Sequence, residues 1–150
     1  MPKNDQNKSD RFSHQPVLLQ EVISLLLPKE GQSYLDVTAG YGGHARRILQ
    51  TTRRPNKAVL VDRDRQAVGF LGRQPDLSQC EIIHQDFLSA SQALVSKNRR
   101  FDMILADLGV SSLHLSEADR GFSVRESGPL DMRMDSRQEM TADFLVNNWD

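Results

Sequence analysis

Hydrophobic positions along this chain follow two alternating spacings. Short apolar runs, each typical of a buried strand, are separated by longer segments in which apolar residues recur at helical spacing. The runs lie at residues 34–38, 58–61, 81–84 and 101–106. Strands that alternate with helical segments of this length favour right-handed crossovers and a parallel sheet covered on both faces. We therefore predict an α/β fold.

The helical segments have recognisable ends. The first spans residues 18–26 and is closed by Pro28, and the second leaves the glycine-rich turn at residues 40–43. Asp64 is placed to cap the third helix, and residues 89–96 predict the fourth. Each predicted helix connects two predicted strands or precedes the first one.

Length and composition fit one domain. The chain has 150 residues, of which 38% are hydrophobic and 26% charged, and its net charge is −1. A domain of this size buries about 70% of its unfolded surface. The near-neutral charge argues against strong overall attraction to nucleic acid. Arginine pairs at 46–47, 53–54 and 99–100 make either a local positive surface or solvated helix ends.

Cysteine usage and the amino terminus indicate a cytoplasmic protein. Cys80 is the single cysteine, which excludes a disulfide within the chain and a cysteine-rich metal site. No apolar run approaches the ~20 residues of a membrane span, and the start of the chain lacks a signal peptide's apolar core. Residues 1–13 are polar and aperiodic, so we expect a flexible tail there.

Residues at three successive strand ends favour a nucleoside ligand. The glycines of the turn at residues 40–43 let a ligand approach the main chain at a helix amino terminus. Asp62 ends the second strand, where an acidic side chain accepts hydrogen bonds from ribose hydroxyls. Asp86 and Phe87 follow the third strand and offer an acceptor and an apolar ring beside a base. Each feature also has a purely structural explanation, as a tight turn, a helix cap or a core residue.

Two enzyme classes fit such a site. Gly40, Gly42 and Ala45, with Asp62 downstream, also satisfy the dinucleotide fingerprint, so an NAD-dependent oxidoreductase is the alternative. The end of the fourth strand favours a methyltransferase acting on an exocyclic amine. Asp107, with the hydroxyls of Ser111 and Ser112 nearby, supplies polar acceptors for such an amine, whereas hydride transfer more usually needs a His, Tyr or Lys proton donor.

The chain also carries a joint set of specific motifs. They are His14-x-Pro16-Val17-Leu18-Leu19-x-Glu21, Gly42-Gly43-His44, Asp107-Leu108-Gly109-Val110-Ser111-Ser112, and the run from Arg120-Gly121-Phe122-Ser123 through Gly128-Pro129-Leu130-Asp131-Met132-Arg133-Met134-Asp135. Together they resemble the ribosomal RNA small subunit methyltransferase H family from residue 14 to the end of the chain.

This resemblance implies an activity, a cofactor and a site. The family uses S-adenosylmethionine to methylate N4 of a cytidine in the decoding centre of 16S rRNA, within the small ribosomal subunit. Its fold is a Rossmann-like methyltransferase domain interrupted by a helical insertion that helps to bind RNA. By resemblance, the cofactor contacts fall on Gly42, Gly43, His44, Asp62, Phe87, Asp107 and His114.

The chain departs from the family pattern in two respects. Glutamine is usual where His114 stands, and histidine titrates near neutral pH. Family members are also about twice as long, so we expect an amino-terminal fragment. The expected parts are the first half of the methyltransferase domain at residues 14–115, and a loop region with the start of a truncated insertion at 116–150. Sheets of this kind have strand order 3-2-1-4-5-7-6, so the fourth strand is expected to form an open edge.

Other interpretations stay open at this stage. A shortened chain is also compatible with a non-catalytic remnant that keeps only nucleoside affinity. The four histidines lack short ligand spacing, so no metal site is predicted. Asp131, Arg133 and Asp135 fit either a clamp on RNA or a salt-bridged surface turn.

Overall fold

The computed structural model of this chain describes residues 16–149, without the side chains of residues 112 and 113. The predicted flexible tail, and His14 of the first motif, therefore lie outside the described residues.

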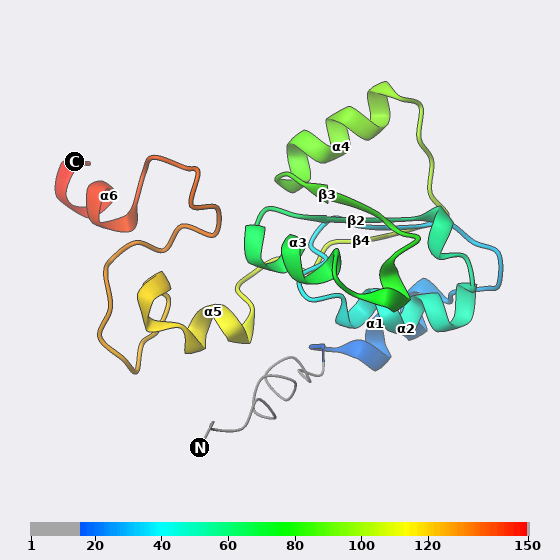
Figure 1. The fold of residues 1–150 in the computed structure, drawn as a ribbon, viewed down its shortest axis with the longest axis horizontal. Helices are drawn as coiled ribbons and strands as arrows, with labels where there is room; N and C mark the ends of the chain where they lie inside the picture. The colour runs from blue at the N-terminus through cyan, green and yellow to red at the C-terminus, as the bar shows by residue number, and fades with distance from the viewer. Residues whose placement is uncertain (1–15, 150) are drawn as a thin grey trace, which may run out of the picture.

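Four parallel strands form one sheet, in the order β3-β2-β1-β4 (Figure 1). The strands are β1 (Tyr34–Asp36), β2 (Ala58–Asp62), β3 (Glu81–His84) and β4 (Met103–Leu105). Leu35 in the middle of β1 pairs with Val59 on one side and with Ile104 on the other. Both the predicted α/β fold and the 3-2-1-4 order of its first strands are confirmed.

Helices connect the strands as the spacing predicts. They are α1 (Leu19–Leu26), α2 (Gly43–Thr52), α3 (Arg65–Leu71) and α4 (Phe87–Ser96), with short 3-10 turns at Pro55–Lys57 and Pro75–Leu77. Asp64 caps α3 by accepting a hydrogen bond from the Gln66 N–H at 2.8 Å, as predicted. Helix α4 begins two residues earlier than predicted because Asp86 caps it.

The two faces of the sheet have separate cores. Alternate residues of a strand point to opposite faces, so Tyr34, Leu60 and Met103 pack toward α1, α2 and α3. Leu35, Val59 and the rest of the second cluster pack toward α4. Figure 1 shows this layering, with α4 alone on its side of the sheet. Each fully buried large apolar side chain contributes about 1.5–3 kcal/mol to folding.

Strand β4 is only partly buried. Met103 is 4% exposed, but Ile104 is 58% exposed, so the prediction of a buried fourth strand is wrong at this residue. Ile104 lies on the face that α4 covers, and α4 packs over β2 instead of reaching this edge. The expected open edge at β4 is therefore present within the described part of the chain, and it is partly apolar.

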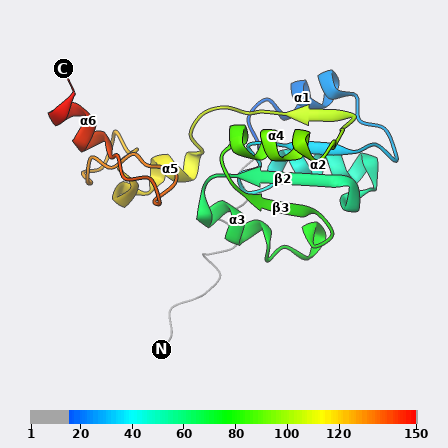
Figure 2. The same ribbon diagram turned by 90° about the horizontal axis from the view of Figure 1, so that it is seen from above.

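Residues 112–149, which we call the C-terminal lobe, extend from the carboxyl ends of the strands (Figures 1 and 2). The lobe holds α5 (Ser112–Ser116), a 3-10 turn at Ala118–Arg120 and α6 (Ala142–Asn148). Its loops pack closely at two glycines. A Cβ at Gly121 would overlap the Pro129 carbonyl, and one at Gly128 would overlap the Ala118 carbonyl. The lobe's glycines are thus required by loop packing.

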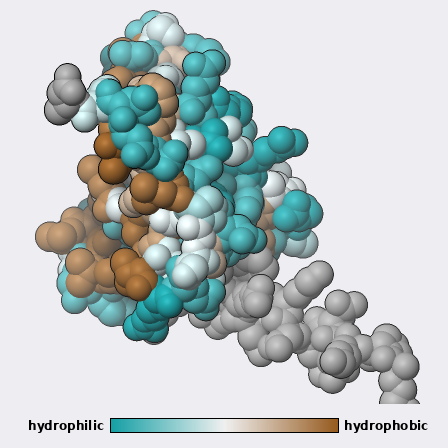
Figure 3. Space-filling view, turned by 90° about the vertical axis from the view of Figure 1, so that its left-hand side faces the viewer, coloured by the Kyte–Doolittle hydropathy of each residue, from teal (hydrophilic) through white to brown (hydrophobic). Residues whose placement is uncertain are grey.

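Apolar side chains gather on the surface at the lobe's end of the molecule (Figure 3). Val124, Val146 and Trp149 are the most exposed apolar residues of the lobe. Within residues 16–149, every helix is too short or too polar to cross a bilayer.

A buried hydroxyl gives a test of the packing around α2. Thr52 is fully buried, and its Oγ1 has no hydrogen-bond partner within the described residues. Because an unpaired buried hydroxyl costs about 1–3 kcal/mol, we expect Thr52→Val to raise the free energy of unfolding by about 1 kcal/mol. Urea denaturation measures the change, and Thr51→Val controls for helix propensity. A loss of stability in Thr52→Val would contradict this packing.

Candidate functional site

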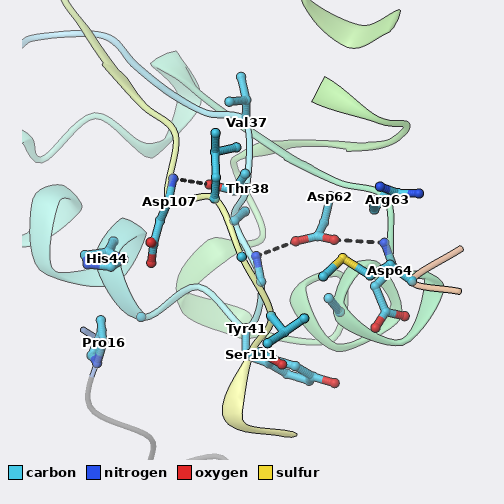
Figure 4. A pocket seen from close by; sticks show the side chains of 18 of the residues that line it. Pro16, Val37, Thr38, Tyr41, His44, Asp62, Arg63, Asp64, Asp107 and Ser111 are labelled. Carbon is cyan, nitrogen blue, oxygen red and sulfur yellow. Dashed lines mark hydrogen bonds between the residues drawn. The ribbon is translucent and has the colours of Figure 1, made fainter. Parts of the chain in front are cut away.

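A cavity of about 670 Å³ lies at the carboxyl ends of the strands. This volume is within the usual range for a small-molecule site. Its walls come from the turn after β1, the ends of β2 and β4, the start of α4 and the C-terminal lobe. Figure 4 shows Thr38, Tyr41, Asp62 and Asp107 around the opening. The cavity stands where open α/β sheets bind ligands.

The main chain of the turn after β1 is hydrogen-bonded to the end of β2. Gly40 has a φ of +52° and donates its N–H to Asp62 Oδ2 at 2.7 Å. The Ala39 N–H donates to the Val61 carbonyl at 2.8 Å, so the turn is attached to β2 at two points. Gly40 lines the cavity, and a Cβ there would lie in ordinary contact with the Thr38 carbonyl, at 4.0 Å.

Gly42 and Gly43, unlike Gly40, are closely packed against side chains of the protein. Gly42 does not line the cavity: a Cβ on it would lie 2.9 Å from Leu71 and 3.0 Å from Leu77, in the core under α3. A Cβ on Gly43, which does line the cavity, would overlap the ring of Pro16. Both positions thus need glycine for packing, whether or not a ligand is bound.

His44 is the buried histidine at the start of α2. Its side chain lines the cavity, and its Nε2 makes a hydrogen bond with the Val17 carbonyl at 3.0 Å. In this structure His44 attaches the segment before α1 to the glycine-rich turn. A role as a cofactor contact stays a prediction.

Figure 4 shows the Asp62 carboxylate between two main-chain nitrogens, those of Gly40 and Asp64. Oδ2 accepts the hydrogen bond from Gly40, and Oδ1 accepts one from the Asp64 N–H at 2.8 Å. Burial raises the pKa of Asp62, although these two bonds favour the charged form. Each carboxylate oxygen has a second lone pair, so both can accept a further hydroxyl donor.

Phe87 is the first residue of α4 and lines the cavity with a side chain that is 47% exposed. Asp86 does not share this position, because its carboxylate caps α4 through the Ser89 N–H at 2.9 Å. Asp86 does not line the cavity, so the structure does not place the predicted acceptor beside Phe87 in the site.

Asp107 follows β4 and lines the cavity with an exposed side chain. Its backbone N–H donates to Thr38 Oγ1 at 2.7 Å. This bond follows the main-chain bond from the Val37 N–H to the Leu105 carbonyl, so it continues the pairing of the two segments past the ends of β1 and β4. Within the described residues the Asp107 carboxylate has no hydrogen-bond or salt-bridge partner. It is therefore available to a ligand. The sequence pattern assigns no role to Thr38, whose only signal is its place two residues after the end of β1.

Ser111 and Ser112 are predicted to lie near Asp107, and the structure describes only the first of these side chains. Ser111 lines the cavity, and its hydroxyl accepts a hydrogen bond from the His114 N–H at 3.3 Å. The side chain of Ser112 lies outside the described part of the structure. Only Asp107 and Ser111 can thus be placed together at the cavity.

His114 lies at the back of the cavity and is 7% exposed. Its Nδ1 accepts a hydrogen bond from the Ser111 N–H at 3.2 Å, which assigns the proton to Nε2. Nε2 donates to Asp64 Oδ2 at 2.7 Å. Both ring nitrogens are therefore occupied by protein, and a cofactor contact from His114 stays a prediction.

Asp64 connects the lobe to the sheet. This carboxylate is 3% exposed and accepts hydrogen bonds from Gln66, His114 and the Arg120 Nη1, the last at 3.3 Å. Burial alone would raise the pKa of Asp64, but the bonds from His114 and Gln66 and the charge of Arg120 outweigh it and lower the pKa. The sequence predicts that Asp64 caps a helix, but it does not predict the cluster of Asp64, His114 and Arg120.

The acidic and basic residues of the last motif pair with each other in tight turns. Arg133 bonds Asp131 at 2.7 Å, and Arg137 bonds Asp135 at 2.7 Å. Of this segment, Met134 lines the cavity. Among the described residues no group of three His, Cys, Asp or Glu side chains has an arrangement that would hold a metal ion.

Comparison with known proteins gives one family. Residues 11–150 match the family described as the MraW methylase family. The chain is 44% identical to "Ribosomal RNA small subunit methyltransferase H" of Nostoc sp. over 147 residues, which cover 93% of this chain and 45% of the relative. The protein of the same name from Synechococcus elongatus is 41% identical, over 97% of this chain and 48% of the relative. The one from Halothermothrix orenii is 39% identical, over 92% of this chain and 45% of the relative. The chain spans about half the length of these relatives.

A buried carboxylate under the glycine-rich turn gives a test of the site's electrostatics. Asp36 is 1% exposed and accepts hydrogen bonds from the Tyr34 hydroxyl at 2.7 Å and the Thr38 N–H at 3.2 Å. Burial raises the pKa of Asp36 to about 6, although both bonds favour the charged form. The folded state thus holds this proton more tightly than the unfolded state does.

We predict that Asp36→Asn changes the pH dependence of stability. A raised folded-state pKa contributes stability that is fully present below about pH 4 and is lost as the pH rises through about 6. When the pH is raised from 4 to 7, the free energy of unfolding of the variant should therefore increase by about 2–3 kcal/mol relative to that of the parent chain, as measured by urea denaturation. Asp102→Asn is the control, because hydrogen bonds from Ser33 lower the pKa of Asp102 and give the opposite sign. A pH-independent difference for Asp36→Asn would contradict the burial of its charge.

Proposed function

The chain belongs to the MraW methylase family, and on this premise we propose that its cavity binds S-adenosylmethionine for methylation of a cytidine N4 in the decoding centre of 16S rRNA. The observation that carries the proposal is the meeting of Asp62, Phe87 and Asp107, from three strand ends, around one cavity. The substrate, the small ribosomal subunit and the cytoplasmic location belong to the same proposal.

The nucleoside part of the cofactor fits the Asp62 end of the cavity. Asp62 accepts hydrogen bonds from the two ribose hydroxyls, and Phe87 packs against the base. Gly40 has no side chain between the main chain and the cavity, and the amino terminus of α2 has no side-chain cap among the described residues, so its N–H groups can face a ligand. When bound, S-adenosylmethionine supplies an electrophilic methyl group.

The Asp107 end of the cavity fits the target amine. A cytosine amine is a weak nucleophile, and its lone pair becomes available when an acceptor holds the N–H hydrogens. In this proposal the Asp107 carboxylate accepts that hydrogen bond and takes up the proton, with Ser111 and Ser112 as further polar groups. Thr38 fixes the main chain of Asp107 and so orients the carboxylate.

We expect S-adenosylhomocysteine to bind to this chain and NAD not to bind. Asp62→Ala should weaken S-adenosylhomocysteine binding by about 1–3 kcal/mol, because the ribose hydroxyls lose their acceptor. Calorimetric titration measures the affinity for both ligands. Asp119→Ala, which removes an exposed carboxylate of the lobe, is the control. Gly42→Val is not a clean variant here, because its side chain would collide with Leu71 and Leu77. Equal affinity for NAD, or full affinity in Asp62→Ala, would contradict the proposal.

We expect the carboxylate of Asp107 to matter for turnover. Asp107→Asn, made at the matching position of the full-length Nostoc relative, should slow single-turnover methylation of unmethylated small subunits by roughly 10²-fold. The circular dichroism spectrum should be nearly unchanged, since the backbone bond to Thr38 remains. Normal turnover in this variant would assign the amine to another residue.

A further inference from the structure

Met134 reaches the cavity from the C-terminal lobe. The next residue before it in sequence that lines the cavity is His114, 20 residues away. Its neighbour Met132 is 47% exposed and does not line the cavity. The lobe therefore contributes Met134 and His114 to a site whose other residues come from the strand ends, the helices beside them and the segment before α1.

Hydrogen bonds place Met134 at the Asp62 end of the cavity. Arg120 Nη2 donates to the carbonyls of Met134 at 3.0 Å and Arg133 at 3.3 Å. The other end of the same guanidinium bonds Asp64, whose N–H donates to the Asp62 carboxylate. Met134 is thus three hydrogen bonds away from the carboxylate proposed to hold the ribose.

The segment that carries Met134 is held at further points. Arg63 Nη2 donates to Gln138 Oε1 at 2.8 Å, which attaches the far side of the segment to the end of β2. The Met132 N–H donates to the Arg120 carbonyl at 3.1 Å. Gly121 and Gly128 allow the loops of the lobe to pack without a Cβ between them. The Arg63 bond thus attaches the segment to the end of β2, and the other contacts hold it within the lobe.

We propose that Met134 contacts the purine base of the bound cofactor and that Arg120 is its positioning residue. The inference rests on the proposed function and deepens it. A thioether side chain offers no partner to the ribose hydroxyls, which Asp62 serves, but it packs well against an aromatic ring. Phe87 lines the same cavity, so a base in this position would meet one apolar side chain from the sheet and one from the lobe.

Two ligands and three variants test the contact. Met134→Ala should weaken S-adenosylhomocysteine binding roughly tenfold, which corresponds to about 1.4 kcal/mol. Met134→Leu keeps the apolar volume and should retain affinity within about threefold. Met132→Ala is the matched control from the same segment and should bind as the parent chain does. Calorimetric titration of the chain measures each constant.

S-ribosylhomocysteine lacks the base. Its binding therefore distinguishes the loss of a contact with the base from a general loss of structure in the variant. Met134→Ala should bind this ligand as well as the parent chain does, because Asp62 still holds the ribose. An equal loss for both ligands, or unchanged S-adenosylhomocysteine affinity in Met134→Ala, would overturn the inference. Failure of the parent chain to bind S-adenosylhomocysteine would instead overturn the proposed function, and the inference with it.

Arg120→Gln tests the positioning role. It should weaken S-adenosylhomocysteine binding about as much as Met134→Ala does, and the double variant should show no further loss, because both changes remove the same contact. Binding of S-ribosylhomocysteine should persist in Arg120→Gln. Additive losses in the double variant would show that Arg120 acts independently of Met134.

Discussion

The buried carboxylate of Asp64 is the constraint on which the arrangement of the molecule depends. It caps α3 and accepts hydrogen bonds from His114 and Arg120 of the C-terminal lobe, while the main-chain N–H of Asp64 donates to the Asp62 carboxylate. Removing one partner of such a buried pair typically costs about 3–5 kcal/mol, because the other charge is left without compensation. The lobe and the sheet are thus held together beside the carboxylate that faces the cavity.

This connection makes the cavity a product of both parts of the chain. The sheet provides polar groups at its strand ends, with Asp62 at one end of the cavity and Asp107 at the other. The lobe provides Met134, whose position depends on Arg120 and through it on Asp64. A ligand that binds at Asp62 therefore meets a wall whose position depends on how the lobe is docked. Cofactor affinity and the placement of the lobe are coupled in this account.

Local patterns predicted most of the fold, because strand and helix spacing, helix caps and glycine-rich turns are properties of neighbouring residues. The four strand segments and the Asp64 cap are examples. The strand order is expected from the family resemblance, and the structure confirms it. The partners of Asp64 lie 50 and 56 residues away, so no local pattern shows the ionic cluster. Exposure of Ile104 depends on how far α4 reaches across the sheet, and the need for glycine at position 42 depends on two leucines of the core. Tertiary packing decides each of these features.

The most direct test of the central claim, a nucleoside site at the strand ends, is a crystal structure of this chain with S-adenosylhomocysteine. The account predicts ribose hydroxyls within hydrogen-bond distance of the Asp62 carboxylate, the base beside Phe87 and Met134, and the homocysteine sulfur toward Asp107. A ligand bound outside this cavity, or one with its base at the Asp107 end, would contradict it.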